Sequence, residues 1–257
     1  MRVANDRWQG IDAIEEIASA PGFFGGVPPQ ALIQEFVSGR EYVVDTVSHA
    51  GEHRVLAVCA YDKHPSSTGA MVYDRLRWLE WGSPETALLT AYAFEVLQAL
   101  DHREGSVHME IILDAEGPCL IDLGARPHGA GHPLKTHRLT GTSQMHAETD
   151  TAAGRDIPRP PGYRLDAHAA IEFLSLVRPA TLRADADPGR ILRLGFVLSG
   201  DIQAWSGTTY PETHSLLDSE ALGLVFVSGA DEAEVAGNAH EVRDVFASML
   251  EETSGAQ

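Results

Sequence analysis

Two apolar runs in the middle of the chain, separated by a four-residue turn, constrain the fold most strongly. Residues 107–113 and 118–123 have the length and composition of buried strands, and Asp114-Ala-Glu-Gly117 joins them. A short linker that ends in glycine is typical of a β-hairpin, so the two runs are predicted to pair antiparallel. Earlier β-like runs at 31–37, 41–48 and 53–61, with glycine-containing turns between them, extend this prediction to an antiparallel meander.

The remaining patterns predict helices and a second unit. A stripe of isoleucines indicates a helix over 11–19, and Ser83-Pro84-Glu85 is typical of the start of a helix that continues to about residue 102. After a Pro- and Gly-containing linker at 153–162, strands are expected near 168–177, 190–198 and 222–228, followed by a helix over 231–251. Strand runs with few helices predict an α+β fold. One domain is expected over 1–155 and a smaller C-terminal α+β subdomain over 156–257.

Glu110 and Asp122 are acidic residues within the two strands of the predicted hairpin. They lie at similar distances from the turn, so the two side chains are expected to face each other across the ladder. Like charges directly opposite on paired strands are destabilising, and ionised carboxylates among Ile and Leu are costly to bury. A divalent cation removes both costs, and Mg²⁺ prefers carboxylate and phosphate oxygens. Arg126 follows at period-two spacing, which predicts the same face and a guanidinium suited to phosphate or a tetrahedral oxyanion.

The acid pair also admits a simpler interpretation, in which both carboxylates lie on a solvated strand face. Arg126 and the glycine-containing segment 128–132 favour a ligand site instead, because glycine allows close approach of a ligand. His108-Met-Glu110 imitates the H-x-E motif of zinc deaminases. The required P-C-x-x-C is incomplete after Pro118-Cys119, which excludes that class.

A histidine-based metal site is a further hypothesis. His128, His132 and His137 are close enough in sequence to form a mononuclear site. The chain contains 12 histidines, however, so such spacings arise readily by chance and carry little weight alone.

Charge and composition exclude several classes of function. With 19 basic and 37 acidic residues, the formal net charge is −18, and so acidic a surface repels nucleic acids and anionic membranes. Two cysteines without a CxxC motif, no visible signal peptide and no long apolar run lead us to expect a cytoplasmic protein. Lysine occurs only twice, and Lys63, in a predicted polar loop, is a candidate phosphate contact.

Three segments together resemble the ATP-grasp superfamily. They are Gln34-Glu-Phe-Val-x-Gly-x-Glu41-Tyr, His108-x-Glu110 and Leu-Ile-Asp122-x-Gly-Ala-Arg126. The chain looks most like the carboxylate–amine ligase branch that includes bacterial L-amino acid ligases, with specific motifs up to about residue 155 and a looser likeness over 165–250. The resemblance implies an ATP-grasp-type antiparallel sheet with flanking helices and a small C-terminal subdomain.

The resemblance also implies roles for individual residues. For ATP it implies Gln34, Glu35, Phe36 and Val37 around the adenine, Glu41 on the ribose and Lys63 on the phosphates. Glu110 and Asp122 would bind the Mg²⁺ ions. Arg126 would stabilise the acyl phosphate and the tetrahedral intermediate. The segment that holds His128, Gly129, Gly131 and His132 would border the substrate acid.

The chain departs from the family pattern in three ways. Gly124 stands where the superfamily more often has a metal-binding asparagine, although the amino acid ligase branch also has a small residue there. Asp122 replaces the usual glutamate and shortens the reach to the metal by one methylene. The family's N-terminal domain and its lysine-bearing glycine-rich loop are not in this chain. We therefore expect a fragment, a truncated product or half of a split enzyme, with an N-terminal half or a homodimer partner to complete it.

The sequence thus predicts an ATP-dependent ligase module that joins a small carboxylate to an amine through an acyl phosphate. Its cofactors are expected to be ATP and Mg²⁺, and the chain alone is expected to turn over poorly. The alternative is a non-catalytic or split ATP-grasp-like protein that binds a nucleotide or a protein partner. The residues do not identify the acid or the amine.

Overall fold

The computed structural model describes residues 3–19, 30–155 and 162–251, which belong to two compact units, 1–38 and 39–257. In the first unit, α1 spans Arg7–Ser19 and begins earlier than predicted. Asp6 sets this start, because its Oδ1 accepts hydrogen bonds from the N–H groups of Trp8 (2.8 Å) and Gln9 (2.9 Å). The strand expected over 31–37 is wrong. Residues 30–38 form neither helix nor strand, and Phe36 is exposed.

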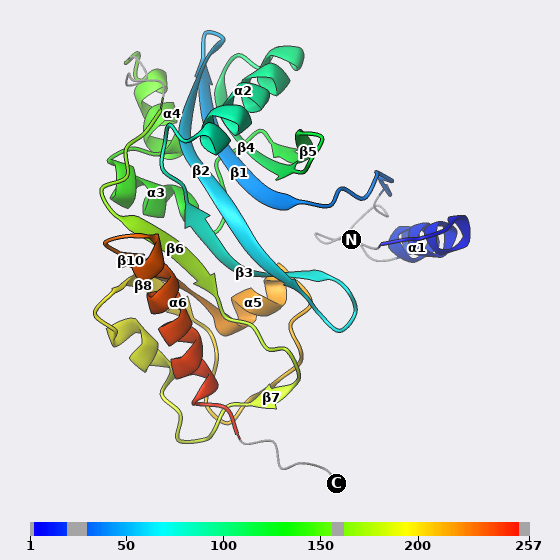
Figure 1. The fold of residues 1–257 in the computed structure, drawn as a ribbon, viewed down its shortest axis with the longest axis vertical. Helices are drawn as coiled ribbons and strands as arrows, with labels where there is room; N and C mark the ends of the chain where they lie inside the picture. Colours follow the sequence, from blue (N-terminus) through cyan, green and yellow to red (C-terminus); the bar gives the residue numbers. More distant parts are fainter. Residues whose placement is uncertain (1–2, 20–29, 156–161, 252–257) are drawn as a thin grey trace. The chain divides into compact units, whose positions relative to one another are not determined.

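The second unit is built on an antiparallel sheet whose eight described strands run in the order β5-β4-β1-β2-β3-β6-β10-β8 (Figure 1). The first five are β1 (Arg40–His49), β2 (Glu52–Pro65), β3 (Met71–Trp78), β4 (Gly105–Leu113) and β5 (Pro118–Gly124). The strands predicted at 41–48, 53–61, 107–113 and 118–123 are confirmed. The sequence patterns did not reveal β3, which extends the meander.

Helix α2 (Pro84–Ala99) covers one face of these strands. Its start is confirmed, because the Ser83 hydroxyl accepts a hydrogen bond from the Thr86 N–H at 3.1 Å. The buried cluster under this helix combines its Leu89, Ala93 and Leu97 with Tyr42, Val44, Val58, Met109 and Ile111 of the strands. Residues that alternate with these strand positions, above all Asp45, His108 and Glu110, therefore face away from α2.

Two short helices pack on the face opposite α2. They are α3 (His132–Thr140) and α4 (Gln144–Ala152). Leu139 of α3 is buried in one cluster with Val43 and Cys59, and Ala147 of α4 is buried with Val47. Asp45 and His108 are buried on this same face.

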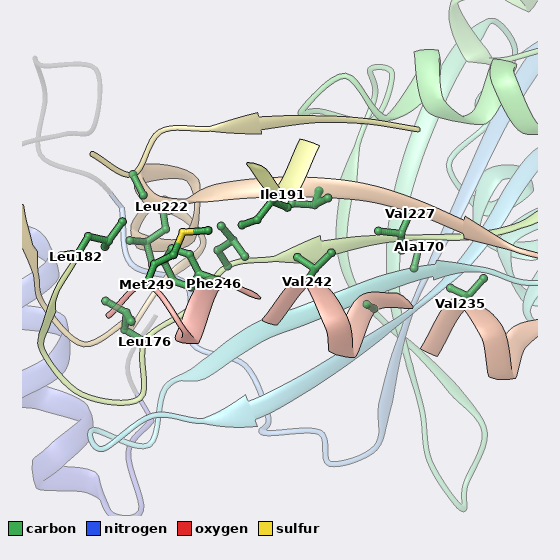
Figure 2. Packing of buried hydrophobic residues seen from close by; sticks show 14 residues of the cluster. Ala170, Leu176, Leu182, Ile191, Leu222, Val227, Val235, Val242, Phe246 and Met249 are labelled. Carbon is green, nitrogen blue, oxygen red and sulfur yellow. The ribbon is translucent and has the colours of Figure 1, made fainter. Parts of the chain in front are cut away.

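Within the described residues, the C-terminal part adds three strands to the same sheet, forms a separate two-stranded sheet and packs a helix against the large sheet. It contains β6 (His168–Phe173), β7 (Ala180–Thr181), the 3₁₀-helix η1 (Pro188–Arg193), β8 (Val197–Ile202), β9 (Thr209–Tyr210), α5 (Leu216–Leu222), β10 (Gly223–Gly229) and α6 (Glu232–Ala247). Figure 2 shows α6 side chains such as Val242 and Phe246 packed in a cluster with Leu222 and Met249. No helix in the described residues is long and apolar enough to cross a membrane.

The strand expected near 190–198 is only partly confirmed, because a 3₁₀-helix occupies residues 190–193 and the strand β8 begins only at Val197. Proline supplies no N–H to a ladder, and Pro188 opens η1. The Arg190 N–H then donates to the Asp187 carbonyl oxygen at 3.0 Å, which closes the first turn. The strands expected near 168 and 222 and the closing helix are confirmed as β6, β10 and α6.

Three residue pairs join β3 to β6 and so connect strands from before and after residue 155. One pair places Arg75 opposite Glu172, whose side chain is fully buried and lies 2.9 Å from Arg75 Nε and 2.6 Å from Arg243 Nη1. The predicted domain boundary at 155/156 stays a prediction, and residues 156–161 of the predicted linker lie outside the described residues.

The contribution of this buried ion pair between β3 and β6 to the stability of the fold is expected to depend on pH. Burial raises the pKa of Glu172 to about 7, against the lowering effect of Arg75 and Arg243. Because the pKa in the folded chain lies above its ordinary value, this carboxyl stabilises the fold most at acid pH. Its contribution falls as the pH rises through 7.

We predict that Arg75→Met lowers the free energy of unfolding by about 3 kcal/mol at pH 8, where it leaves a buried carboxylate short of one cation. At pH 5 the loss should be smaller, because Glu172 is then protonated. Urea unfolding at the two pH values measures both losses. The control is Arg155→Met, which removes an exposed ion pair with Asp150 and should cost about 0–1 kcal/mol at either pH. Equal losses for Arg75→Met at pH 5 and pH 8 would contradict the prediction.

Candidate functional site

Glu110 and Asp122 are register partners in the β4–β5 ladder, as the hairpin pattern predicts. The Glu110 side chain is 23% exposed, whereas Asp122 is exposed. Burial acts to raise the pKa of Glu110, but hydrogen bonding to His108 and the positive charge of Lys63 outweigh it and hold the pKa below its ordinary value. The structure therefore presents an ionised glutamate directly opposite an aspartate, which is a donor set suited to a hard cation.

Glu41 and Lys63, the residues assigned to ribose and phosphate, form an ion pair with each other. The Lys63 ammonium lies 3.9 Å from the centre of the Tyr73 ring, and the Tyr73 hydroxyl donates to Glu41 Oε1 at 3.4 Å. The expectation that Lys63 lies in a polar loop is wrong, because β2 continues to Pro65 in register with β3 and includes Lys63. Burial raises the pKa of Glu41 even though Lys63 opposes this effect.

Arg126 lies beyond the end of β5, which stops at Gly124. The prediction that Arg126 continues the extended strand is wrong, because its N–H donates to the Gly124 carbonyl oxygen at 2.8 Å and turns the chain. The guanidinium is exposed and donates to the Pro127 carbonyl oxygen at 2.9 Å. Arg126 Cγ and Nε lie 3.4 Å from the position that a Cβ on Gly124 would take, so the Arg126 side chain packs against this glycine.

A buried network of Asp45 and three histidines lies next to Glu110. Asp45 Oδ1 is 2.9 Å from His108 Nδ1, and Asp45 Oδ2 is 3.0 Å from His128 Nδ1 and 3.3 Å from His132 Nδ1. His108 Nε2 lies 3.6 Å from Glu110 Oε1, which connects the network to the acid pair. Asp45 is only 3% exposed, so histidine N–H groups rather than bulk water compensate its charge.

The network gives its members very different proton affinities. Burial acts to raise the pKa of Asp45, but His128, His108 and His132 hold it well below its usual range. Burial acts to lower the pKa of His108, yet hydrogen bonds to Asp45 and Glu110 raise it to about 9. Burial and the charge of His128 lower the pKa of His132 to about 3, despite its contact with Asp45. At neutral pH His108 is therefore a cation and His132 is neutral.

Packing explains the neutral state of His132. Its ring stacks on Trp78 with a centroid distance of 4.5 Å and on His128 at 3.8 Å. Its Nε2 lies 3.5 Å from Cys59 Sγ, and its Nδ1 lies 3.3 Å from Thr136 Oγ1. These contacts anchor the start of α3 to the sheet and hold the preceding segment over the site.

The structure brings some of the predicted residues together and separates others. His128 and His132 join the network, whereas Gly129 and Gly131 are exposed in the segment between them. His137 stacks on His146 at 3.9 Å, and among the described residues the group able to hold a metal is Asp45, His108 and His128, so the trio with His137 does not form. Gln34, Glu35, Phe36 and Val37 belong to the first unit and are not placed relative to this face.

Asp45 is the site residue that the sequence analysis missed. It precedes His108 by 63 positions, and only the β1–β4 register makes the two residues partners. A signal was present, because a single aspartate follows Val43 and Val44 inside an apolar strand. Such a residue needs a buried partner, but the sequence does not say which one.

We predict that, in chelator-treated protein at pH 7.5, nitrogen-15 NMR of the imidazoles shows His108 with both nitrogens protonated and His132 neutral. Asp45→Asn should lower the pKa of His108 towards its ordinary value, because it removes the buried negative charge. His240, which is exposed on α6, serves as the internal control, and its imidazole resonances should have the same chemical shifts in both proteins at pH 7.5. A His108 resonance that is neutral at pH 7.5 in the wild type would refute this electrostatic account.

Comparison with known proteins adds one relative by sequence. No protein-family model matches the chain. The curated protein dapdiamide A synthase from Enterobacter agglomerans is 25% identical over 252 residues, which cover 95% of this chain and 58% of that protein. The chain thus spans less than two thirds of the length of this relative.

Solved structures share the fold. L-amino acid ligase from Bacillus licheniformis matches with a TM-score of 0.66 and 19% identity, covering 84% of this chain and 52% of that chain. Phosphoribosylglycinamide synthetase from Anaerococcus prevotii matches with a TM-score of 0.59 and 11% identity, covering 84% of this chain and 54% of that chain. These matches confirm the predicted fold class, an antiparallel sheet with flanking helices.

Proposed function

We propose that this chain, which has the ATP-grasp fold of the carboxylate–amine ligases it resembles, supplies the nucleotide and metal site of an ATP-dependent ligase that forms C–N bonds. The observation that carries the proposal is the direct register of Glu110 and Asp122 across the β4–β5 ladder. The similarity to dapdiamide A synthase and the fold shared with an L-amino acid ligase support the same class of reaction.

The acid pair fits Mg²⁺ by the chemistry of its donors. Both donors are carboxylates, the preferred ligands of this ion, and the pKa of Glu110 lies below its ordinary value, so it needs no deprotonation at neutral pH. Without a cation, two like charges on register partners repel each other. When bound, Mg²⁺ would supply charge neutralisation to the phosphates of ATP.

The chain's own residues would position the substrates. Glu41, held by Lys63 and Tyr73, would accept hydrogen bonds from the ribose hydroxyls, and Lys63 would turn from Glu41 to the phosphates. In the first unit, the segment Gln34–Val37 would contact the adenine through backbone groups and Phe36. Because the Lys63 ammonium already has a carboxylate partner, its contact with phosphate is an exchange of one anion for another.

Arg126 would act on the acyl group. A carboxylate oxygen would attack the γ-phosphorus of ATP and displace ADP, which gives an acyl phosphate. The amine would then attack the acyl carbon, and the tetrahedral oxyanion would collapse to the amide with release of phosphate. The exposed guanidinium beyond the end of β5 is a permanent cation that suits both species. His128, Gly129, Gly131 and His132 would border the substrate acid, with Asp45 fixing the two imidazoles.

Calorimetric titration of this chain with ADP, with and without Mg²⁺, tests the metal site. We predict that Mg²⁺ strengthens ADP binding to the wild type about tenfold or more, and that Glu110→Gln abolishes this gain while metal-free binding is kept. The matched control is Glu116→Gln in the exposed turn of the same hairpin, which should retain the gain. An unchanged Mg²⁺ effect in Glu110→Gln would show that the acid pair does not bind the metal.

Phosphate release in the complete enzyme tests the role of Arg126. With a panel of carboxylates and amino acids as substrates, Arg126→Ala should lower kcat about 10²- to 10³-fold, because it removes a cation from the developing oxyanion. Arg164→Ala changes an exposed arginine paired with Asp166 and should leave turnover unchanged. Near-normal turnover in Arg126→Ala would refute its assignment, and nucleotide binding without turnover for any substrate would favour a non-catalytic binding protein.

A further inference from the structure

We propose that Asp45, His108 and His128 form a binding site for Zn²⁺ or a similar transition metal, separate from the Glu110–Asp122 pair. The three residues come from β1, from β4 and from the segment before α3, so the fold rather than a local motif assembles them. This proposal goes beyond the ligase function and does not depend on it.

The geometry of the three donor atoms carries the proposal. His108 Nδ1 and His128 Nδ1 lie 2.9 Å and 3.0 Å from the two oxygens of Asp45, and one donor atom from each residue lies within 4.8 Å of the others. Ligands about 2.0–2.1 Å from a tetrahedral ion are separated by about 3.3 Å. The two nitrogen–oxygen distances are a few tenths of an ångström shorter than this separation, so these atoms must move apart to admit an ion.

The donor types select the metal. Two imidazole nitrogens and one carboxylate oxygen suit Zn²⁺, whereas Mg²⁺ prefers oxygen donors and keeps several waters. The two proposed sites on this face therefore prefer different metals. Glu110 and Asp122 offer only oxygen donors, whereas Asp45, His108 and His128 offer mainly nitrogen donors.

Neighbouring groups supply the support that metal-bound histidines usually have. When Nδ1 of His108 binds the metal, its proton is carried by Nε2, which lies 3.6 Å from Glu110 Oε1. Zinc-bound histidines commonly donate their other N–H to a carboxylate, and closing this 3.6 Å gap to hydrogen-bond distance would make that contact here. Asp45 and Glu110 together balance the two positive charges of the ion, and the excess proton of His108 passes to solvent.

The ion would connect the sheet to the segment that carries Arg126. His128 is two residues after Arg126, and its N–H donates to Gln144 Oε1 at 2.8 Å, so this segment is already tied to α4. A bond from His128 to a metal on β1 and β4 would add a second fixed point. A metal ion bound here would also orient Glu110 through His108. It would therefore influence how Glu110 and Asp122 bind their own metal.

The test uses the chain without a histidine tag, treated with a chelator and then held in excess Mg²⁺. Calorimetric titration with Zn²⁺ should show one ion bound per chain, and Co²⁺ in its place should give the intense visible absorption of a four-coordinate site. His128→Gln and Asp45→Asn should weaken Zn²⁺ binding by about 100-fold or more, and Glu110→Gln by about tenfold. His146→Gln, on α4 and outside the group, is the matched control and should bind as the wild type does.

The result that would overturn the proposal is a wild type that binds no Zn²⁺, or one whose affinity is unchanged by His128→Gln. His128 is 10% exposed and lies outside the sheet, so its variant is expected to fold even where Asp45→Asn does not. Far-UV circular dichroism of each variant checks folding. Failure here would leave the Mg²⁺-dependent binding of ADP unaffected, which separates this proposal from the ligase function.

Discussion

The antiparallel pairing of β4 with its two neighbours determines which charges meet on the face of the sheet opposite α2. On one side it sets Glu110 opposite Asp122 of β5, and on the other it sets His108 opposite Asp45 of β1. Side chains two positions apart on a strand share a face, so His108 and Glu110 necessarily project together. One strand therefore carries both the proposed magnesium ligand and a histidine held by a buried aspartate. A one-residue slip would turn all of these groups into the apolar core beneath α2.

The sequence predicts the parts of this site that depend on local rules. A tight hairpin turn leaves little freedom in strand register, which is why the pairing of Glu110 with Asp122 can be predicted from spacing alone. Predictions that extrapolate past an element's end are less secure. Period-two spacing holds only inside a strand, and it fails for Arg126 because β5 stops at Gly124. Lys63 is misplaced for the opposite reason, since β2 continues into a polar segment that pairs with β3.

Long-range contacts account for what the sequence does not predict. Asp45 carries no recognisable motif, and its three histidine neighbours come from segments more than 60 residues away. The pairing of β3 with β6 likewise places Arg75 opposite Glu172, and local periodicity in the sequence cannot predict this contact. Buried charges therefore mark the positions where distant segments must meet, because each one needs a partner of opposite charge. Such residues are worth noting in a sequence even when their partners cannot be named.

The central claim is that the acid pair of the β4–β5 hairpin binds the metal that accompanies the nucleotide. A crystal structure of the chain grown with ADP and Mn²⁺ tests it most directly, because the anomalous scattering of manganese locates the ion without assumptions about its ligands. The account predicts a manganese peak in coordinating contact with the carboxylates of Glu110 and Asp122 and with the phosphates of ADP. A nucleotide bound elsewhere, or a manganese ion that contacts neither carboxylate, would contradict it.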